Sequence, residues 1–323
     1  MSLSYICVTT QTNVLKLNFL NLNIQNETSR LRAVVLGTAT SNGPIPEIED
    51  AYDPKSVEHI KAGTYPVEAD MTLEMEAVAN VFKKYEVKVY RPEIIKDYNQ
   101  IFARDIALVI DDKFIKSNIL PDREKEIKAI QYVIDQIDPD KVCKAPSEDI
   151  HFEGGDIMIH NDHIFIGTYK GEDYPDCIVA RTNMKGVEYI KSLFPNKIVK
   201  EFDLNKSMQD PRDNALHLDC CFQPVGENKA IIHKEGFRDP LDYEYLVDFF
   251  GMENLFHIDK NEMYHMNSNI FSIAEDVVIS ERNFTRLNTW LRSLNIKVEE
   301  VPYAEIAKQE GLLRCSTMPL IRD

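Results

Sequence analysis

The chain has 323 residues, a formal net charge of −16, and 44% hydrophobic and 28% charged residues. This composition is typical of a soluble globular protein with a substantial core, and the acidic surplus argues against a surface that binds nucleic acid or an anionic membrane. The six cysteines contain no CxxC pair, which fits reduced thiols in the cytoplasm better than a disulfide framework. We therefore expect a cytoplasmic monomer or homodimer that binds no nucleic acid and no membrane.

The N-terminal stretch is apolar only in part, because Gln11, Asn13 and Lys16 interrupt it. It is too polar for a transmembrane helix and lacks the layout of a signal peptide. We treat residues 1–25 as an N-terminal extension and residues 26–323 as one catalytic domain.

The first predicted unit begins with an apolar strand over residues 30–37 that ends at a glycine. A long loop over residues 38–65 contains several prolines, and loops of this length in compact domains are often lids or binding loops. Helical spacing of apolar residues then predicts a helix over residues 67–85, and a short strand follows at residues 87–90.

A second pattern then occurs four times: a polar head, a β-hairpin and, in each case, a helix. The predicted helices cover residues 123–137, 184–194, 241–250 and 284–294. Asp105, Asp156, Asp219 and Asn269 occupy equivalent places at the heads of the four hairpins, at intervals of roughly 50 residues. Such self-similarity is typical of a radially repeated architecture.

Together with the first unit, which the C-terminal strand would complete, the repeats predict five units. The expected fold is an α/β, five-bladed, pseudo-symmetric propeller of ββαβ units. In this arrangement the polar heads lie together at one end of a central channel.

The heads and the C-terminal strand supply a thiol, an imidazole and several carboxylates: Asp105, Glu153, Asp156, His217, Asp219 and Cys315. Carboxylates bind a guanidinium group through charge-assisted hydrogen bonds. A thiolate can attack its central carbon, and an imidazolium can protonate the departing amine. A positive substrate also favours the thiolate over the thiol. The set therefore predicts covalent catalysis on a small-molecule guanidine.

The sequence resembles the guanidino-group-modifying enzymes of the pentein fold, which include arginine deiminase, the amidinotransferases and dimethylarginine dimethylaminohydrolase. The matching motifs lie in order along the chain: Phe102-Ala103-Arg104-Asp105, Glu153-Gly154-Gly155-Asp156, Ala180-Arg181-Thr182-Asn183, His217-Leu218-Asp219 and Arg314-Cys315-Ser316-Thr317-Met318-Pro319-Leu320. Each motif alone is weakly specific, whereas five in the same order are strongly specific.

The resemblance implies three catalytic residues. Cys315 would form a covalent thiouronium intermediate, and His217 would protonate the leaving group and then activate water or an amine. Glu153 would bind the guanidine and hold His217.

The resemblance also implies a substrate-binding set. Asp105 and Asp219 would bind the guanidinium nitrogens, and Arg181 would bind the carboxylate of an amino acid. Asp156 and Phe102 would line the site.

Asp219 favours an unsubstituted guanidinium, because a second carboxylate needs N–H donors that dimethylation of one nitrogen removes. The motifs are closest to those of arginine deiminase, which would hydrolyse arginine or a close derivative to a ureido product and ammonia. Two features depart from the bacterial enzymes. The chain lacks their helical insertion, and residues 308–313 replace the glycine-rich run before the cysteine. Both departures concern the end of the substrate remote from the guanidine.

Several alternatives stay open at the level of sequence. Within the same superfamily these are an amidinotransferase, a dimethylarginine dimethylaminohydrolase, a hydrolase of a ureido substrate such as citrulline, and a non-catalytic binding propeller. A lone cysteine before an apolar strand is more often a packed side chain, and Asp105 or Asp219 alone could cap a turn. No HxxxH or CxxC spacing indicates a metal, and no glycine-rich phosphate loop indicates a nucleotide, so we expect no cofactor.

Overall fold

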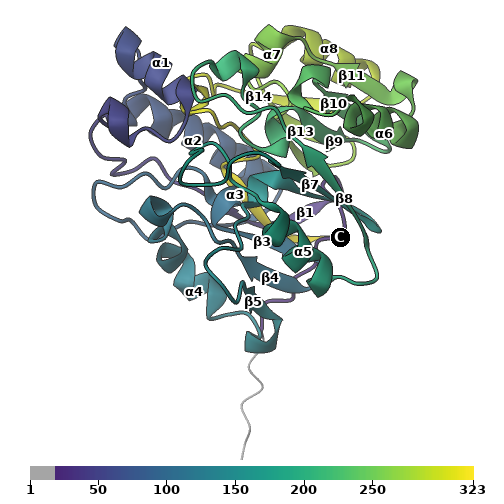
Figure 1. Ribbon diagram of the computed structural model, residues 1–323, viewed down its shortest axis with the longest axis horizontal. Helices are drawn as coiled ribbons and strands as arrows, with labels where there is room; N and C mark the ends of the chain where they lie inside the picture. Colours follow the sequence, from purple (N-terminus) through teal and green to yellow (C-terminus); the bar gives the residue numbers. More distant parts are fainter. Residues whose placement is uncertain (1–18) are drawn as a thin grey trace, which may run out of the picture.

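The computed structural model describes residues 19–323, and within them the chain forms five three-stranded sheets (Figure 1). In every sheet the middle strand pairs antiparallel with one neighbour and parallel with the other. The strand orders are β15-β1-β2, β3-β4-β5, β6-β7-β8, β9-β10-β11 and β12-β13-β14. The predicted α/β architecture of five repeated units is confirmed.

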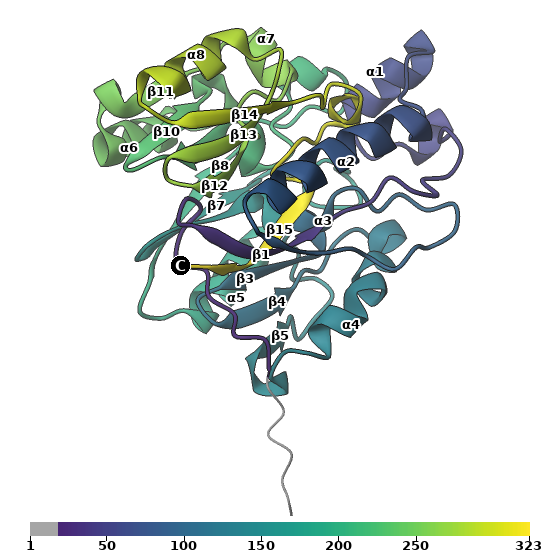
Figure 2. The same cartoon turned by 180° about the vertical axis from the view of Figure 1, so that it is seen from behind.

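The first sheet joins the two ends of the described chain. Its strands are β1 (Leu31–Leu36), β2 (Lys88–Tyr90) and β15 (Thr317–Arg322). β15 runs antiparallel to β1, with Val34 opposite Pro319, and Figure 2 shows the two strands side by side. The C-terminal strand therefore completes the first unit, as predicted, and brings the residues before it to the centre of the molecule.

The other four sheets are built on hairpins with tight turns. Asp111, Asn161 and Asn228 have φ angles of 53°, 57° and 57° in three of these turns, a region that Asn and Asp tolerate better than most residues. The strands are β3 (Ala107–Ile110), β4 (Lys113–Lys116), β5 (Val142–Lys144), β6 (Ile157–His160), β7 (His163–Thr168), β8 (Ile198–Asp203), β9 (Phe222–Val225), β10 (Lys229–Ile232), β11 (Leu255–His257), β12 (Phe271–Ala274), β13 (Val277–Glu281) and β14 (Lys297–Val301).

Most predicted helices form close to their expected bounds. The helices are α1 (Pro54–Ala62), α2 (Glu68–Lys84), α3 (Ala103–Ile106), α4 (Gln131–Ile134), α5 (Met184–Leu193), α6 (Pro240–Phe250), α7 (Lys260–Tyr264) and α8 (Thr285–Ser293). Among residues 19–323, no helix combines the length and the apolar character needed to cross a bilayer.

One loop prediction and one helix prediction were wrong. The loop predicted over residues 38–65 contains α1, which begins after Asp53 because the Asp53 carboxylate accepts a hydrogen bond from the Ser56 amide at 2.7 Å. The helix predicted over residues 123–137 is shorter. It consists of a 3₁₀ turn at Glu126–Ile130 followed by α4, and Arg123 and Glu126 at its start turn inward to form a buried ion pair.

The prediction that residues 1–25 lie outside the core needs a correction. Residues 1–18 lie outside the described part, but Leu22 and Ile24 are buried and pack in one of two apolar clusters. Ile24 also forms a β-bridge with Asp111. Burying each aliphatic side chain is worth about 1.5–3 kcal/mol, so this segment is part of the core.

Three of the four polar heads are short helical turns that precede the first strand of their units. They are α3, the 3₁₀ turn Gly154–Asp156 and the 3₁₀ turn Leu218–Cys220. The turn Gly154–Asp156 contacts both of the others. The fold thus brings side chains from separate units to one place.

Candidate active site

Cys315 lies two residues before β15 and is almost fully buried, with 2% of its surface exposed. Asn269 fixes this part of the backbone, because its side-chain oxygen accepts hydrogen bonds from the amides of Arg314 (2.9 Å) and Cys315 (3.2 Å). The Asn269 amide group also lies 3.1 Å from the Cys315 sulfur. The sequence placed Asn269 at a repeat head but gave it no part in the site.

The Asp219 carboxylate lies beside the Cys315 sulfur, with oxygens at 3.6 and 3.8 Å. Asp219 also forms an ion pair of 2.9 Å with the buried Arg314, which pairs in turn with Glu27 at 3.0 Å. Burial and then the carboxylates of Asp219 and Asp105 raise the pKa of Cys315 well above its usual range. Without a cation in the site, Cys315 is therefore a thiol.

His217 and Glu153 form a buried pair, with His217 Nε2 at 2.7 Å from Glu153 Oε2. Burial disfavours the charged imidazole, but the nearby carboxylates of Asp105, Asp156 and Glu153 outweigh it and raise the pKa of His217. Burial also opposes ionisation of Glu153, yet Arg181 and His217 together lower the pKa of Glu153. Both shifts favour an imidazolium paired with a carboxylate, and Nδ1 is the ring nitrogen that Glu153 leaves free.

Asp105 has one committed oxygen and one free oxygen. Arg123 binds Oδ2 at 2.8 Å and holds Glu126 at 2.7 Å with its Nε. Oδ1 is buried, has no hydrogen-bond partner among the described residues, and lies 4.0 Å from His217 Nδ1. Such an oxygen is a ready acceptor for an N–H donor that enters the site.

Arg181 does not point a free guanidinium group at the site. Its three nitrogens contact Glu153 Oε2 at 3.2 Å, the Tyr52 carbonyl at 3.0 Å and the Ile178 carbonyl at 3.0 Å. Tyr52 belongs to the long segment before α1, so Arg181 also ties this segment to the site.

Asp156 and Phe102 have different positions. Asp156 is fully buried and accepts a hydrogen bond of 2.9 Å from the Leu218 amide, which holds the turn after His217. Phe102 packs against Gly311, where an added Cβ would lie 2.3 Å from a ring carbon. The close approach of this backbone to the ring explains why residue 311 is a glycine.

These groups meet at a cavity of about 280 Å³. Of the eight predicted site residues, five line it: Phe102, Asp105, Arg181, His217 and Cys315. The other three, Glu153, Asp156 and Asp219, are buried and contact lining residues or their neighbours; Asp219 lies directly beside the Cys315 sulfur. Sequence reasoning missed Arg123, Glu126 and Glu310 in the lining. For Arg123 and Glu126 the one signal in the sequence is a run of charged residues at the start of the predicted helix. For Glu310 it is the replacement of the glycine-rich run by residues 308–313.

A metal ion is a further geometric option, because ligand atoms of Asp105, Glu153 and His217 all lie within 4.8 Å of one another. Both carboxylates already bind an arginine, at 2.8 Å for Asp105 and 3.2 Å for Glu153. These guanidinium groups oppose a divalent cation at the same carboxylates.

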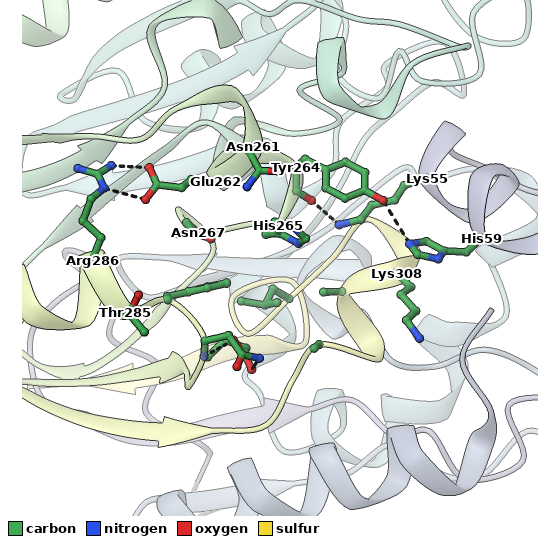
Figure 3. A pocket seen from close by; sticks show the side chains of 16 residues that line it. Lys55, His59, Asn261, Glu262, Tyr264, His265, Asn267, Thr285, Arg286 and Lys308 are labelled. Carbon is green, nitrogen blue, oxygen red and sulfur yellow. Dashed lines mark hydrogen bonds and ion pairs between the residues drawn. The ribbon is translucent and has the colours of Figure 1, made fainter. Parts of the chain in front are cut away.

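A second and larger cavity, of about 530 Å³, lies between α7, the start of α8, α1 and the segment before β15 (Figure 3). Figure 3 shows Arg286 and Glu262 pointing toward one another, and they form a hydrogen bond of 2.8 Å. Lys55 donates to the Tyr264 carbonyl, and the Tyr264 hydroxyl lies 3.4 Å from His59 Nε2. No cysteine lines this cavity.

Five sheets of this topology and a buried Cys–His–carboxylate cluster define a pentein of the guanidino-group-modifying superfamily. The chain belongs to the family described as N,N dimethylarginine dimethylhydrolase, eukaryotic, whose model matches residues 57–322.

Relatives of known sequence carry related names. The chain is 27% identical over 224 residues to the uncharacterized protein YkgA of Bacillus subtilis, covering 69% of this chain and 70% of YkgA. It is 28% identical over 268 residues to arginine deiminase of Bacillus cereus, covering 69% of this chain and 62% of the deiminase.

Solved structures share the fold at low identity. SxtG, an amidinotransferase from Microseira wollei, gives a TM-score of 0.73 at 16% identity, covering 94% of this chain and 98% of SxtG. The N-terminal domain of ArgZ, an arginine dihydrolase from cyanobacteria, gives a TM-score of 0.73 at 16% identity, covering 90% of this chain and 98% of that domain.

Proposed function

We propose that the protein is a cysteine-dependent hydrolase of a guanidino compound, arginine or a close derivative, that works through a covalent thiouronium intermediate without a cofactor. The observation that carries this proposal is the buried Cys315 sulfur at 3.6 Å from the Asp219 carboxylate, in a cavity that it shares with the free Asp105 oxygen. This arrangement fits a planar cation between two carboxylates with a nucleophile below its central carbon.

Binding and activation are coupled in this proposal. The guanidinium N–H groups donate to Asp105 Oδ1 and to Asp219, and the added positive charge lowers the pKa of the adjacent thiol. The thiol proton leaves to solvent, and the Cys315 thiolate attacks the guanidino carbon to form a neutral tetrahedral adduct.

His217 then acts as a general acid. Its imidazolium transfers the Nδ1 proton to the departing nitrogen, ammonia leaves, and the carbon keeps its bond to sulfur as a thiouronium cation. Glu153 stabilises the imidazolium before transfer and orients the ring. Arg181, which binds Glu153, is a positioning residue in this scheme, and Asp156 positions the turn after His217.

Hydrolysis completes the cycle. Neutral His217 accepts a proton from water, hydroxide attacks the thiouronium carbon, and the thiolate departs. The ureido product loses one proton, which replaces the proton that the thiol released, so the balance is one guanidinium plus one water to one ureido compound plus one ammonium ion.

A second candidate is hydrolysis of a methylated arginine, which the family description favours. The same steps apply, with dimethylamine as the leaving group in place of ammonia. The two carboxylates near Cys315 favour an unsubstituted guanidine, because dimethylation removes both N–H donors from one nitrogen. Transfer of the amidino group to an amine is a third outcome. A cytoplasmic location and a monomeric or homodimeric state stay predictions.

The test is a panel of arginine, Nω,Nω-dimethylarginine, guanidinoacetate and citrulline, assayed for ammonia, methylamines and ureido products with and without amine acceptors. We expect ammonia and citrulline from arginine in water alone. Dimethylamine release only from the methylated compound would replace the first candidate by the second. Turnover only with an amine acceptor would replace hydrolysis by transfer.

A further inference from the structure

Asn269 occupies the one repeat head, among the four, whose side chain is an amide rather than a carboxylate. The equivalent residues of the other three units are Asp105, Asp156 and Asp219. Asn269 is fully buried and lies two residues before β12. The proposed function gives roles to the three aspartates but none to Asn269, although its amide nitrogen lies 3.1 Å from the Cys315 sulfur.

The orientation of the Asn269 side chain is set by two backbone amides. The amides of Arg314 and Cys315 can only donate, and they lie 2.9 and 3.2 Å from Asn269 Oδ1. The oxygen must therefore face these amides, which directs the NH₂ group to the Cys315 sulfur at 3.1 Å and to the Asp219 carbonyl oxygen at 3.4 Å. The two N–H donors thus have two acceptors, and one of these is the reacting atom of the proposed mechanism.

Ionisable groups surround the Cys315 sulfur from several elements: Asp105, His217, Asp219, Cys220, Tyr303 and Arg314. Burial and then the carboxylates of the two aspartates raise the pKa of Cys315, whereas hydrogen bonds with the Leu312 backbone and with Asn269 lower it. The two cations in this set, His217 and Arg314, are each paired with a carboxylate. An aspartate at position 269, as at the other heads, would add a third carboxylate at the sulfur, whereas the amide supplies a donor.

We propose that Asn269 is a catalytic residue whose amide donates a hydrogen bond to the Cys315 thiolate once the substrate guanidinium has bound. This role rests on the proposed function and adds a residue to it. Hydrogen bonds to charged groups are roughly twice as strong as those between neutral groups, so this bond favours the thiolate over the thiol. Because the site begins as a thiol, a bond that strengthens with the charge on sulfur lowers the barrier to attack. The bond weakens in the neutral adduct and is regained when the thiolate departs.

Asn269→Asp separates this role from a structural one. The substitution keeps an oxygen for the backbone amides of residues 314 and 315 and, once the new carboxyl is ionised, removes the N–H donor. Alkylation of Cys315 by iodoacetamide measures the thiolate without any turnover, when the modified peptide is quantified by mass spectrometry. At pH 8 we expect the alkylation rate to fall by about 10-fold or more, the size expected for a hydrogen bond to a charged group.

The pH profile of alkylation gives a readout that a loss of packing alone would not move in the predicted direction. The rate rises with pH as the thiol ionises. Loss of the donor raises the pKa of Cys315, so this rise should move to higher pH by about one unit or more. If the proposed function holds, kcat for arginine at pH 8 should also fall by about 10-fold or more.

Asn288→Asp is the matched control. Asn288 is 1% exposed and donates a hydrogen bond of 3.0 Å to the Glu281 carbonyl, but it lies in α8 and does not line the cavity. The substitution therefore repeats the same chemical change at another buried amide. Its alkylation rate at Cys315 should stay within about 2-fold of the unchanged protein.

An unchanged alkylation profile in folded Asn269→Asp would overturn the role of Asn269. If this variant does not fold, the intact protein labelled with ¹⁵N at asparagine replaces it. One side-chain amide signal should then shift with the same midpoint pH as the alkylation rate, and should not do so in Cys315→Ala. Absence of any such signal would also overturn the role. A shifted alkylation profile together with no turnover of any guanidine would overturn the proposed function and retain the hydrogen bond to the thiolate.

Discussion

The two cavities of this protein differ in a way that volume does not describe. The larger, at about 530 Å³, is lined by polar groups that bind one another, such as Arg286 with Glu262, and none of its lining side chains has a buried polar atom without a partner among the described residues. The smaller, at about 280 Å³, contains the free Oδ1 of Asp105. Unsatisfied buried groups, rather than space, indicate where a ligand completes the structure.

The pKa shifts of the ionisable groups also differ between the two cavities. In the larger cavity burial lowers the pKa of His59 and of His265, and it lowers the pKa of Lys55 to about 8. In the smaller cavity carboxylates keep His217 charged despite its burial, and Cys315 is held as a thiol. The smaller cavity combines a thiol and an imidazole whose pKa values depend on the same nearby carboxylates, so a cation that binds these carboxylates changes both.

The largest expected effect is at the nucleophile. Cys315→Ala should reduce turnover of every guanidine by at least about 10⁴-fold, because the variant lacks the atom that forms the intermediate. Ammonia release measures it. Cys143→Ala, at a half-buried cysteine in β5, is the control and should retain activity. Wild-type rates in Cys315→Ala would end the covalent proposal.

The next largest effect is expected at Glu153, whose carboxylate contacts His217. In the intact protein the raised pKa of His217 keeps the general acid protonated above ~6.5, so the rate should fall only as pH rises through that higher value. Glu153→Gln removes a carboxylate that raises this pKa, so the alkaline limb of the kcat profile should move to lower pH. We expect a loss of about 10²–10⁴-fold at neutral pH.

A matched test of this prediction is the pH profile of Glu126→Gln, which removes a carboxylate bound to Arg123 rather than to His217. Its alkaline limb should stay in place. An unchanged alkaline limb in Glu153→Gln would show that His217 is not the group that titrates there.

A smaller effect is expected from filling space beside Phe102. In Gly311→Ala the new Cβ would lie 2.3 Å from the Phe102 ring, so the cavity wall must move, at a cost of about 1–3 kcal/mol. We expect a roughly 10-fold or greater loss in kcat/KM. Gly171→Ala is the control. Its Cβ would lie 2.5 Å from the ring of Tyr169, and neither residue lines the cavity, so kcat/KM should match that of the unchanged protein.

The smallest effect is expected in the larger cavity. Arg286→Ala breaks a partly exposed ion pair with Glu262, and such pairs contribute little to stability. Turnover of any guanidine should stay within about 2-fold of the unchanged protein. A loss as large as that of Glu153→Gln would contradict the assignment of chemistry to the smaller cavity.

The architecture could be predicted from the sequence because it repeats. Asp105, Asp156, Asp219 and Asn269 recur at the heads of hairpins whose turn residues favour the required φ angles, so each unit supports the prediction for the others. The first unit offered no such support. There Asp53 and Pro54 form the start signal of α1, but the surrounding prolines are equally typical of a loop.

The hydrogen bonds and ion pairs between side chains of the site could not be predicted from the sequence in the same way. Residue types identified Cys315, His217 and Asp105 as candidates, but which oxygen of Asp105 is free depends on where Arg123 lies in space. Likewise no sequence pattern predicts that Glu310 lines the cavity. Its position depends on a backbone φ angle of 56° and on a hydrogen bond from Asn214, which lies 96 residues earlier in the chain. Such contacts join residues far apart in the chain, and propensity does not encode them.

The central claim is that Cys315 carries a covalent intermediate of hydrolysis. The most direct measurement is the intact mass of the protein after rapid acid quench during turnover of arginine, with the modified peptide located by digestion. We predict an added mass of the substrate minus ammonia on the peptide that contains Cys315. An unmodified Cys315 under turnover in both the unchanged protein and a slowed His217→Ala variant would contradict the account, and an adduct consisting of the amidino group alone would show that the other carbon–nitrogen bond breaks.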